Sequence, residues 1–338
     1  MHVLITGSAG FIGNALALRL VRSGVRVSGV DSMSDYYDVS LKRDRLARLG
    51  GMEGFTQHHV DIRDMEALSK VFADDPPDRV VHLAAQAGVR HSLEHPRDYV
   101  DTNLVGSFNV LELCRAHGVD HLVLASTSSA YGANDQYPFH ESDRAAHPLT
   151  IYAATKLGAE MMAHSYAHLH HMPTTAVRFF TVYGPWGRPD MAPMLFAERM
   201  FGGRAIDVFN EGRMERDFTY IDDLVEGIAR LLDTPPERGA PLPGVTDSLS
   251  PVAPYRLVNI GNAAPVALMD FIGAMEDAVG RPARKNMMEM QRGDVVRTFA
   301  RTELLQALTG FSPATDIRTG VSRFIDWYRD YYGHAPAA

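Results

Sequence analysis

Tyr152 and Lys156 stand four residues apart in the segment IYAATKLGAE, residues 151–160. On a helix they would share one face, because side chains four positions apart are neighbours there. A tyrosine hydroxyl has an ordinary pKa of about 10 and is a weak base at neutral pH. A nearby ammonium group would favour the ionised form and lower that pKa. The same spacing is common on surface helices without any function, so its meaning depends on the rest of the chain.

Four hydroxyl side chains end an apolar run a short distance upstream, in LASTSSAYG, residues 124–132. They are Ser126, Thr127, Ser128 and Ser129. Most such runs are ordinary turn chemistry. Hydroxyls can also donate hydrogen bonds to a polar ligand, so the run either ends a strand or contacts a substrate.

A glycine-rich turn lies near the start of the chain, in TGSAGFIG, residues 6–13. Gly7, Gly10 and Gly13 stand between an apolar strand and a helical pattern, which is the setting of a dinucleotide site. Glycines there permit a tight turn and a close approach to a pyrophosphate, whose charge faces the helix N-terminus. The spacing is not the usual G-x-G-x-x-G, and the flanking strand and helix make the signal strong.

Two aspartates end the next two predicted strands. Asp31 stands 18 residues after Gly13. A carboxylate there can accept hydrogen bonds from the adenosine ribose and repels a 2′-phosphate, which favours NAD over NADP. The alternative is an exposed strand-end residue without a ligand. Asp61, at the end of the third strand, is expected to touch the adenine.

Short β-branched runs alternate with helical patterns over the first 180 residues. Strands are predicted over 2–6, 25–31, 55–61, 79–85, 121–127 and 174–180. Helices are predicted over 12–23, 65–74, 101–117 and 151–168. Alternating elements with nearly continuous apolar strands predict a parallel sheet covered on both faces, the doubly wound α/β fold of the Rossmann type.

The rhythm changes after residue 180, where proline, glycine and polar loops increase. We therefore predict an NAD-binding domain over 1–180 and a smaller, partly interleaved domain over 181–338. Residues 234–254 are expected to form an exposed irregular insertion. Residues 255–262 are expected to return to the main sheet as a strand.

Composition excludes several classes of function. The 338 residues carry a formal net charge of −8, so no basic surface field attracts nucleic acid. Residues 3–21 are apolar but contain three glycines and lack a positively charged start, so neither a membrane span nor a signal peptide is expected. A single cysteine, Cys114, permits no intrachain disulfide and favours the cytoplasm. The histidines in HLHHM, residues 168–172, are interpreted as a solvated helix end, and no metal site is expected.

The chain resembles the extended short-chain dehydrogenases/reductases, and among them the UDP-glucuronate 4-epimerases. The likeness runs nearly end to end, through TGSAGFIG, DSMSDYYDVSLKRDRL, HLAAQAGVRHSLEHP, STSSAYG, YAATK, FFTVYGPWGRPDMA, RDFTYIDDLVEG and RGDV. It implies tightly held NAD, the Tyr152–Lys156 pair, a catalytic hydroxyl at Thr127, a C-terminal domain that binds the UDP-sugar, and a homodimer formed through paired helices. Lys156 would also bind the nicotinamide ribose, and the positive nicotinamide ring would lower the Tyr152 pKa further.

The resemblance also implies a set of binding residues. The cofactor would contact Gly7, Gly10, Phe11, Ile12, Gly13, Asp31, Asp61, Ile62, Leu83, Ala84, Ala85, Tyr152 and Lys156. The substrate would contact Arg90, Thr127, Ser128, Ser129, Thr181, Arg188, Arg216 and Arg292. Among these, Arg216 and Arg292 would face the UDP moiety.

The hydroxyl run separates the reactions that relatives of this fold perform. Sugar-nucleotide 4,6-dehydratases carry an Asp–Glu pair at this strand end, in TDEVYG, and UDP-glucuronate decarboxylases carry a glutamate, in TSEVYG. Ser128 and Ser129 stand at those two places in this chain. Neither the acids for elimination nor the decarboxylase glutamate is therefore present, and oxidation and reduction at C4 remain.

Two further residues indicate the substrate. Thr181, in RFFT, replaces the asparagine of RYFN in UDP-galactose 4-epimerases. Arg188, in PWGRPD, can bind a carboxylate bidentately, while the hydroxyl run and Thr181 donate to the same group. Taken alone, Arg188 could equally be a solvated loop charge. Together with the resemblance, these residues predict a sugar with a carboxylate at C6.

The predicted function is reversible, NAD-dependent epimerisation of UDP-glucuronate to UDP-galacturonate through a 4-keto intermediate, with Tyr152 taking the O4 proton. The alternatives are a UDP-glucuronate decarboxylase, another UDP-sugar 4-epimerase and, outside the enzymes, an NAD-binding sensor protein. Such sensors often lose the tyrosine or the lysine, and this chain has both.

Overall fold

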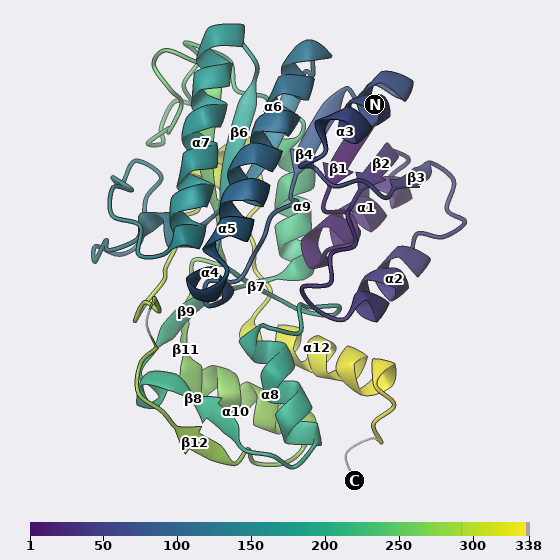
Figure 1. Ribbon diagram of the computed structural model, residues 1–338. Helices are drawn as coiled ribbons and strands as arrows, with labels where there is room; N and C mark the ends of the chain where they lie inside the picture. The colour runs from purple at the N-terminus through teal and green to yellow at the C-terminus, as the bar shows by residue number, and fades with distance from the viewer. Residues whose placement is uncertain (292, 336–338) are drawn as a thin grey trace.

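Seven parallel strands form the main sheet of the computed structural model, which describes residues 1–291 and 293–335 (Figure 1). In spatial order they are β10 (Tyr255–Ile260), β6 (Thr174–Phe179), β5 (His121–Thr127), β4 (Arg79–His82), β1 (His2–Thr6), β2 (Arg26–Val30) and β3 (Phe55–His58). The strand order reverses between β1 and β4, and doubly wound sheets bind ligands at that switch point, beyond the carboxyl ends of the strands. The predicted fold class is confirmed.

Each of the six predicted strands is present, but two of them end early. β3 ends at His58 rather than at residue 61, and β4 ends at His82 rather than at residue 85. Beyond these points the backbone leaves the sheet, and its residues line the pocket described below. Every residue of β1, β5 and β6 is buried, which requires helices on both faces of the sheet.

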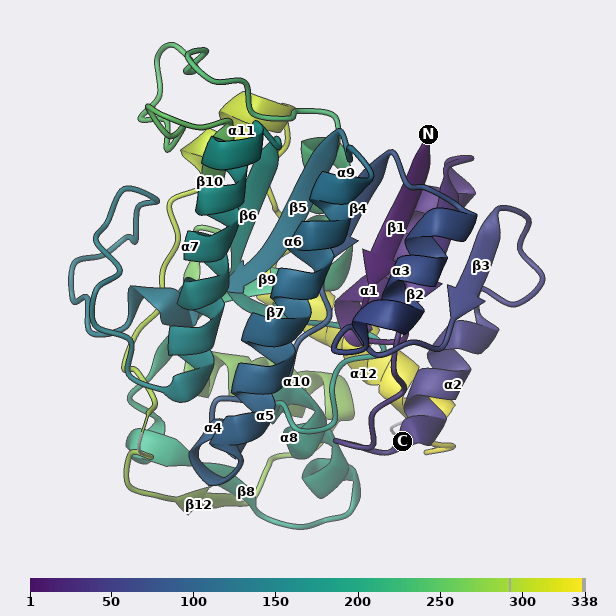
Figure 2. The same ribbon diagram turned by 45° about the horizontal axis from the view of Figure 1, so that its top comes forward.

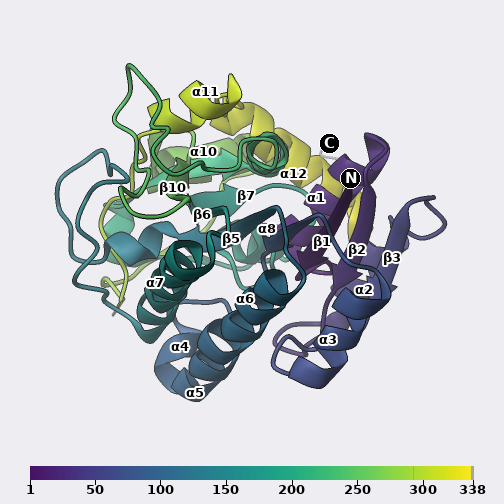
Figure 3. The same ribbon diagram turned by 90° about the horizontal axis from the view of Figure 1, so that it is seen from above.

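Helices cover both faces of the main sheet (Figure 3). One face carries α3 (Met65–Asp74), α6 (Ser107–Ala116) and α7 (Ile151–His170), whose apolar side chains form one core cluster with the strands. The other face carries α1 (Phe11–Arg22), α9 (Ile221–Leu231) and α11 (Glu303–Thr309), which share a second cluster. The apolar pattern of the predicted helices therefore marks the sides that pack on the sheet.

The predicted helix over 101–117 has two parts. Val100–Gly106 is a π-helix, and α6 follows it directly. The Asn103 amide nitrogen donates to the Gln86 carbonyl and to the Thr155 hydroxyl, both at 3.1 Å, and its oxygen accepts from the Gln86 N–H at 2.8 Å. Wider turns of this kind are frequent at functional sites. Here the turn fastens the segment after β4 to α7.

Apart from α2 (Val39–Ala47) and the short helices over 91–99, most of the remaining elements lie below the carboxyl ends of the main strands in Figure 1 and are seen from another side in Figure 2. They are the helices α8 (Ala192–Phe201), α10 (Leu268–Val279) and α12 (Ile317–Tyr331), a sheet of β11 (Pro265–Ala267), β9 (Glu215–Tyr220) and β7 (Thr181–Tyr183), and a sheet of β12 (Lys285–Met287) and β8 (Ile206–Val208). The chain crosses between the two parts, since α9 packs on α1 and β10 pairs with β6. The domain boundary at residue 180 stays a prediction.

Residues 234–254 contain neither helix nor strand, as their composition predicts. The nearly buried ion pair of Asp247 with Arg256 fastens this insertion to β10, with Oδ1 and Nε 2.9 Å apart. Across the part of the chain that the structure describes, no helix has the length and apolar character needed to cross a bilayer.

Candidate active site

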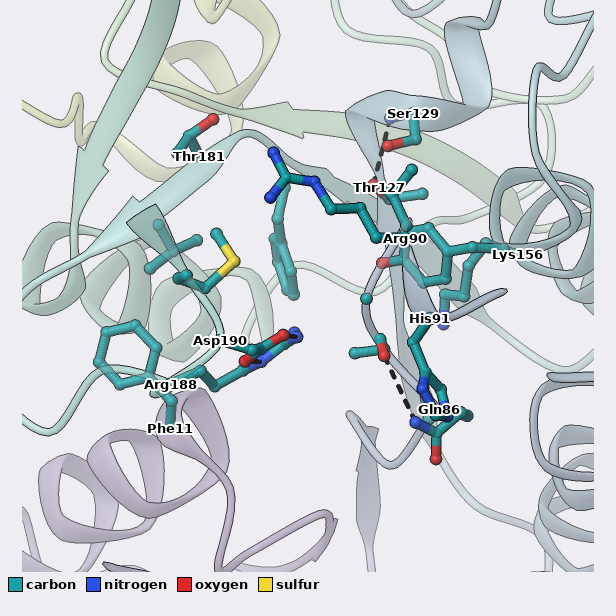
Figure 4. A pocket seen from close by; sticks show the side chains of 18 of the residues that line it. Phe11, Gln86, Arg90, His91, Thr127, Ser129, Lys156, Thr181, Arg188 and Asp190 are labelled. Atoms are coloured by element: carbon teal, nitrogen blue, oxygen red, sulfur yellow. Dashed lines mark hydrogen bonds and ion pairs between the residues drawn. The ribbon is translucent and has the colours of Figure 1, made fainter. Parts of the chain in front are cut away.

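A cavity of about 1370 Å³ opens at the carboxyl ends of the main strands. Its wall combines the glycine turn after β1, the ends of β2, β4 and β5, the first turns of α7 and the segment before α8. Figure 4 shows Arg188 and Asp190 on one side of it and Thr127, Ser129 and Lys156 on the other. Because a pocket for one ligand typically measures about 300–1,000 Å³, this cavity has room for a dinucleotide and a substrate together.

The structure brings the predicted site residues together in this one cavity. The predicted cofactor residues on its wall are Gly7, Gly10, Phe11, Ile12, Gly13, Asp31, Asp61, Ile62, Leu83, Ala84, Ala85, Tyr152 and Lys156. The predicted substrate residues on its wall are Arg90, Thr127, Ser128, Ser129, Thr181, Arg188 and Arg216. Arg292 lies outside the described residues. What each residue binds stays a prediction.

The glycine turn has no room for side chains. Gly7 adopts a φ of +78°, and a Cβ atom on it would lie 2.9 Å from the Ala84 nitrogen. A Cβ atom on Gly13 would lie 2.1 Å from the Gly7 carbonyl oxygen, closer than any real contact. α1 begins directly after Gly10 without a side-chain cap, so the N–H groups of its first turn are available to an anion. These features fit the pyrophosphate of NAD.

Asp31 lies directly after β2, with its carboxylate against the glycine turn. One oxygen accepts from the Ala9 N–H at 3.0 Å and the other from the Met33 N–H at 2.8 Å. The residue is 8% exposed. Each oxygen keeps a lone pair for a further donor, so the carboxylate is fixed in place and can still accept from a ribose hydroxyl.

Asp61 and Ile62 follow β3 and have different surroundings. The Asp61 carboxylate forms an ion pair with Arg63, whose Nη2 lies 2.7 Å away and whose backbone N–H donates at 2.8 Å. This internal partner leaves Asp61 less free for an adenine than the sequence suggests. Ile62 is buried and packs closely on Gly106. A Cβ atom added to Gly106 would lie 2.6 Å from the Ile62 Cδ1 atom.

A hydrogen-bond chain from the interior holds the backbone after β4. The Thr6 hydroxyl accepts from the N–H groups of Leu83 and Ala84, at 3.2 and 3.1 Å. The same hydroxyl lies 2.7 Å from His82 Nδ1, and His82 Nε2 lies 2.9 Å from the Ser107 hydroxyl. Burial lowers the pKa of His82 to about 3, so the ring stays neutral at physiological pH. This series of hydrogen bonds fixes the segment that carries three of the predicted cofactor contacts, Leu83, Ala84 and Ala85.

Thr127, Tyr152 and Lys156 come together from two elements. β5 ends at Thr127, and Tyr152 and Lys156 lie on the first turns of α7. Burial raises the pKa of Tyr152, whereas the Thr127 hydroxyl and the Arg188 guanidinium lower it. Within this chain the groups that oppose the effect of burial are therefore Thr127 and Arg188, rather than Lys156 as the sequence predicts.

Lys156 is buried one helical turn from a second charged group, Glu160. Burial lowers the pKa of Lys156 to about 8, against the opposite effect of Glu160. Glu160 accepts from Arg178 Nε at 3.0 Å and from Arg178 Nη2 at 2.8 Å, and also from the Ser126 hydroxyl. Because Arg178 already neutralises Glu160, the Lys156 ammonium is only partly compensated.

The four hydroxyls of the run after β5 divide between two surroundings. Ser126 donates to the buried carboxylate just described. Thr127 begins the short 3-10 helix Ser128–Tyr131 by accepting from the Ser129 N–H at 3.2 Å, and this turn puts both of its serines on the pocket wall. Thr181, the first residue of β7, lies on the wall of the same pocket. The run therefore both ends a strand and supplies hydroxyls to the cavity.

Arg188 already binds a carboxylate of this chain. Its Nε donates to one oxygen of Asp190 at 3.0 Å, and its Nη2 donates to the other oxygen. The Tyr36 hydroxyl also donates to Asp190, at 3.0 Å, and burial and the negative charge of Asp190 raise the Tyr36 pKa to about 12. The sequence predicts a substrate carboxylate as the bidentate partner of Arg188, but in the structure that partner is Asp190. Contact of the substrate with the rest of the guanidinium stays a prediction.

The other arginines of the predicted substrate site have weaker partners. Arg90 Nη2 lies 3.7 Å from the Asp294 carboxylate, and its guanidinium lies 4.8 Å from the centre of the Phe209 ring. Arg216 Nη1 donates to the carbonyls of Glu215 and of residue 296, at 2.9 and 3.1 Å. Each of these arginines keeps N–H groups for a phosphate.

Comparison with known proteins agrees with this geometry. A model of the NAD dependent epimerase/dehydratase family matches residues 3–242. The chain belongs to this family. The probable UDP-glucuronate 4-epimerase of Rhizobium meliloti (strain 1021) is 56% identical over 338 residues, which are 99% of each chain. UDP-glucuronate 4-epimerase 2 of Arabidopsis thaliana is 44% identical over 337 residues, covering 98% of this chain and 76% of the plant protein.

A solved structure gives the same result. The UDP-glucuronic acid 4-epimerase from Bacillus cereus, in complex with UDP-glucuronic acid and NAD, superposes with a TM-score of 0.87 at 31% identity. The match covers 98% of this chain and 100% of the other. The resemblance drawn from the motifs is confirmed.

Several residues that line this epimerase-family pocket or, like the buried His82, support its wall are not found by the sequence reasoning. Asp190 stands two positions after Arg188, and an acid so close to a predicted functional arginine is the one local signal for it. Tyr36 lies in a polar loop after β2, and His82 ends β4 among apolar residues, so neither carries a local signal. Both depend on contacts between segments that are far apart in the sequence.

Proposed function

We propose that this chain interconverts UDP-glucuronate and UDP-galacturonate by oxidation and reduction at C4 with NAD. One observation carries the proposal: at the strand end beside Tyr152, this chain has serines at positions 128 and 129 where dehydrating and decarboxylating relatives have acids. Similarity to proteins named UDP-glucuronate 4-epimerase along almost the whole chain supports the same reaction.

Tyr152 is the base for the C4 hydroxyl in this proposal. Thr127 and Arg188 favour its ionised form against the effect of burial. Lys156 keeps its proton below about pH 8, so its positive charge is available at neutral pH to favour the phenolate further. The glycine turn, Asp31 and the segment after β4 would hold NAD, which would supply hydride transfer at C4. Tyr152 takes the O4 proton in the first half-reaction and gives it back in the second.

The sugar ring must rotate between the two half-reactions so that its other face meets the cofactor, while the nucleotide stays bound. Arg90 and Arg216 line the same cavity and would supply positive charge for the diphosphate. The cavity of about 1370 Å³ leaves space for the ring to rotate about its diphosphate link. Inversion at C4 then follows from hydride return to the opposite face.

The active site must also keep the carboxylate on the sugar. Oxidation at C4 makes a β-keto acid, which loses carbon dioxide when the C5–C6 bond stands perpendicular to the carbonyl plane. The hydroxyls of Ser128, Ser129 and Thr181 can donate to the carboxylate and hold it near that plane, while the single O–H of Thr127 is directed to Tyr152. A glutamate at position 129 would instead set a negative charge beside the carboxylate. The observed hydroxyls therefore favour epimerisation over decarboxylation.

Product analysis tests the proposal directly. Purified protein is incubated with UDP-glucuronate without added NAD, and the nucleotide sugars are separated over many turnovers. We expect UDP-galacturonate with little UDP-pentose, and an increased pentose fraction in Ser129→Glu. Mostly UDP-pentose from the wild type would instead support the decarboxylase. Turnover of UDP-glucose but not of UDP-glucuronate would support another epimerase, and NAD binding without any turnover would support a sensor.

We further propose that two copies pair through α6 and α7 in the cytoplasm. The apolar side chains of Val105, Phe108 and Met161 are exposed on the outer side of these helices and of the π-helix before α6. Pairing would remove this surface from water. Phe108→Asp should convert a dimer into a monomer in light scattering behind size-exclusion chromatography, whereas a wild type that elutes as a monomer would contradict the pairing.

A further inference from the structure

Two histidines and an aspartate converge at the mouth of the active-site cavity. His91 begins α4 (His91–Glu94), His95 follows it, and Asp98 lies in α5 (Pro96–Tyr99). One ring nitrogen of each histidine and one carboxylate oxygen lie within 4.8 Å of one another. Among the described residues, this is the group of three such side chains that could hold one ion.

The backbone of this segment holds the three side chains on one side. The His95 N–H donates to the His91 carbonyl at 2.9 Å, which closes one helical turn between them. Their rings stack with centres 4.3 Å apart and planes inclined by 22°. Pro96 then starts α5, which brings the Asp98 carboxylate to 3.9 Å from His91 Nε2. The arrangement is therefore local and does not depend on a distant contact.

The interior anchors the same segment firmly. Tyr99 is fully buried, and its hydroxyl donates to the Ala87 carbonyl at 2.9 Å. The side chain of Asn103 holds Gln86 by two hydrogen bonds, of 2.8 and 3.1 Å. Arg97, which would otherwise compete for Asp98, donates to Asp101 at 2.8 Å. The three side chains are thus presented from a rigid base.

We propose that His91, His95 and Asp98 bind one Zn²⁺ ion, with water completing the coordination. Imidazole nitrogens with a carboxylate oxygen suit zinc, whereas magnesium and calcium prefer oxygen ligands alone. Zn–N bonds measure about 2.0–2.1 Å, so the side chains must approach one another by rotation. His95 and Asp98 are exposed and can rotate.

The bound ion would act on the adjacent substrate site. Arg90 directly precedes His91 and extends into the cavity (Figure 4). The His91 ring also packs on Tyr36, with ring centres 4.8 Å apart. Zinc therefore fixes the segment that carries a predicted diphosphate ligand and slows turnover. This consequence rests on the proposed epimerase function, whereas zinc binding itself does not.

Calorimetric titration of the NAD-loaded full chain with ZnCl₂, after removal of metal by EDTA, tests the site. We expect one equivalent bound with micromolar affinity. His95→Gln and Asp98→Asn should each weaken binding by more than about tenfold, since even the loss of an outer partner of a metal ligand costs that much. His170→Gln is the matched control, because His170 is also an exposed histidine, at the end of α7, and it should bind zinc like the wild type.

Two results would overturn the site. One is a wild type without saturable zinc binding, and the other is unchanged zinc affinity in both His95→Gln and Asp98→Asn, whatever His170→Gln does. Circular dichroism and NAD content confirm that each variant is folded. In the turnover assay, zinc should inhibit the wild type, EDTA should restore it, and His95→Gln should resist. A protein that binds zinc at this site but turns over no UDP-sugar would contradict the proposed function and leave the site standing.

Discussion

The two walls of the active-site cavity are held by different kinds of interaction. On the wall formed by β1, β2 and β4, backbone groups and tight glycine contacts set the shape, and Asp31 is fixed by two backbone N–H groups. On the facing wall, Arg188 is held bidentately by the Asp190 carboxylate, and Arg216 is held by backbone carbonyls of this chain. The first wall is ready for its ligand as it stands. In the proposed function the second wall exchanges its own partners for those of a substrate, so the two walls should respond differently to substitution.

The largest effect on turnover should come from substitution of Tyr152, the proposed base. Tyr152→Phe removes the base but fills the same space, so turnover should fall about a hundred- to ten-thousand-fold. NAD content and UDP-glucuronate affinity should stay near those of the wild type, because neither wall changes. Steady-state kinetics together with equilibrium dialysis measures both. More than about a tenth of wild-type turnover would show that another residue is the base.

Gly13→Ala should break the cofactor wall alone. The new Cβ atom would meet the Gly7 carbonyl oxygen at 2.1 Å, so the turn must open. We expect the purified variant to lose most of its NAD, measured after acid release of the nucleotide. Gly273→Ala is the matched control, since open space surrounds that helical glycine. It should keep its NAD and gain about 0.5–1 kcal/mol of stability. Equal NAD content in the two variants would contradict the role given to this turn.

Arg188→Ala should break the facing wall alone. We expect the KM for UDP-glucuronate to rise by about tenfold, as for the loss of roughly 1.4 kcal/mol of binding, with NAD content unchanged. The KM for a neutral sugar such as UDP-glucose should rise less, because it has no carboxylate, whereas kcat should fall for both sugars, since Arg188 also favours the ionised form of Tyr152. Asp190→Asn sharpens the test, since it keeps the size of the side chain but frees the guanidinium. If Arg188→Ala instead releases NAD and raises the KM equally for both sugars, the arginine serves the cavity as a whole.

The smallest predicted effect is that of Lys156→Met on the free energy of unfolding, and its size depends on pH. The folded-state pKa of Lys156 is about 8, below the ordinary value of about 10.4. Between these two pKa values the unfolded chain binds more protons than the folded chain, so the free energy of unfolding of the wild type rises with pH. Below pH 8 the buried ammonium is charged in both states, and the wild type bears the full cost of burying it. The variant should therefore be more stable than the wild type by about 1 kcal/mol at pH 7, and by less at pH 9.5. Urea midpoints that differ equally at both pH values would exclude Lys156 as the titrating group.

Much of the fold is predictable because it depends on local pattern. The strands over 2–6, 121–127 and 174–180 are apolar runs buried on both faces, and the structure has them within one residue of their predicted ends. β3 and β4 are shorter than predicted because apolar residues also line the cavity, where the pattern of a strand continues without the strand. The π-helix before α6 is not predictable from local pattern, and the hydrogen bonds that Asn103 makes from it reach distant segments.

The candidate site shows the same division. Gly13, Asp31, Tyr152 and Lys156 stand in short motifs with a mechanism, and all of them line the cavity. The partner of Arg188 could not be inferred in the same way, because an arginine followed two residues later by an aspartate is common on loops. Only the tertiary packing that brings Tyr36 onto the same carboxylate shows that the three form one unit.

The hydrogen bond between Tyr36 and Asp190 joins the loop after β2 to the segment before α8, and so ties the two walls together. If the dinucleotide binds at the glycine turn as proposed, we expect its release to require the two walls to part. An enzyme closed in this way keeps the same NAD molecule from one substrate molecule to the next. Its activity does not depend on the ratio of NAD to NADH in the cell. The same closure has a liability. If the 4-keto sugar dissociates before the hydride returns, NADH remains bound behind the Tyr36–Asp190 contact. That enzyme molecule is inactive until the contact opens and NADH leaves.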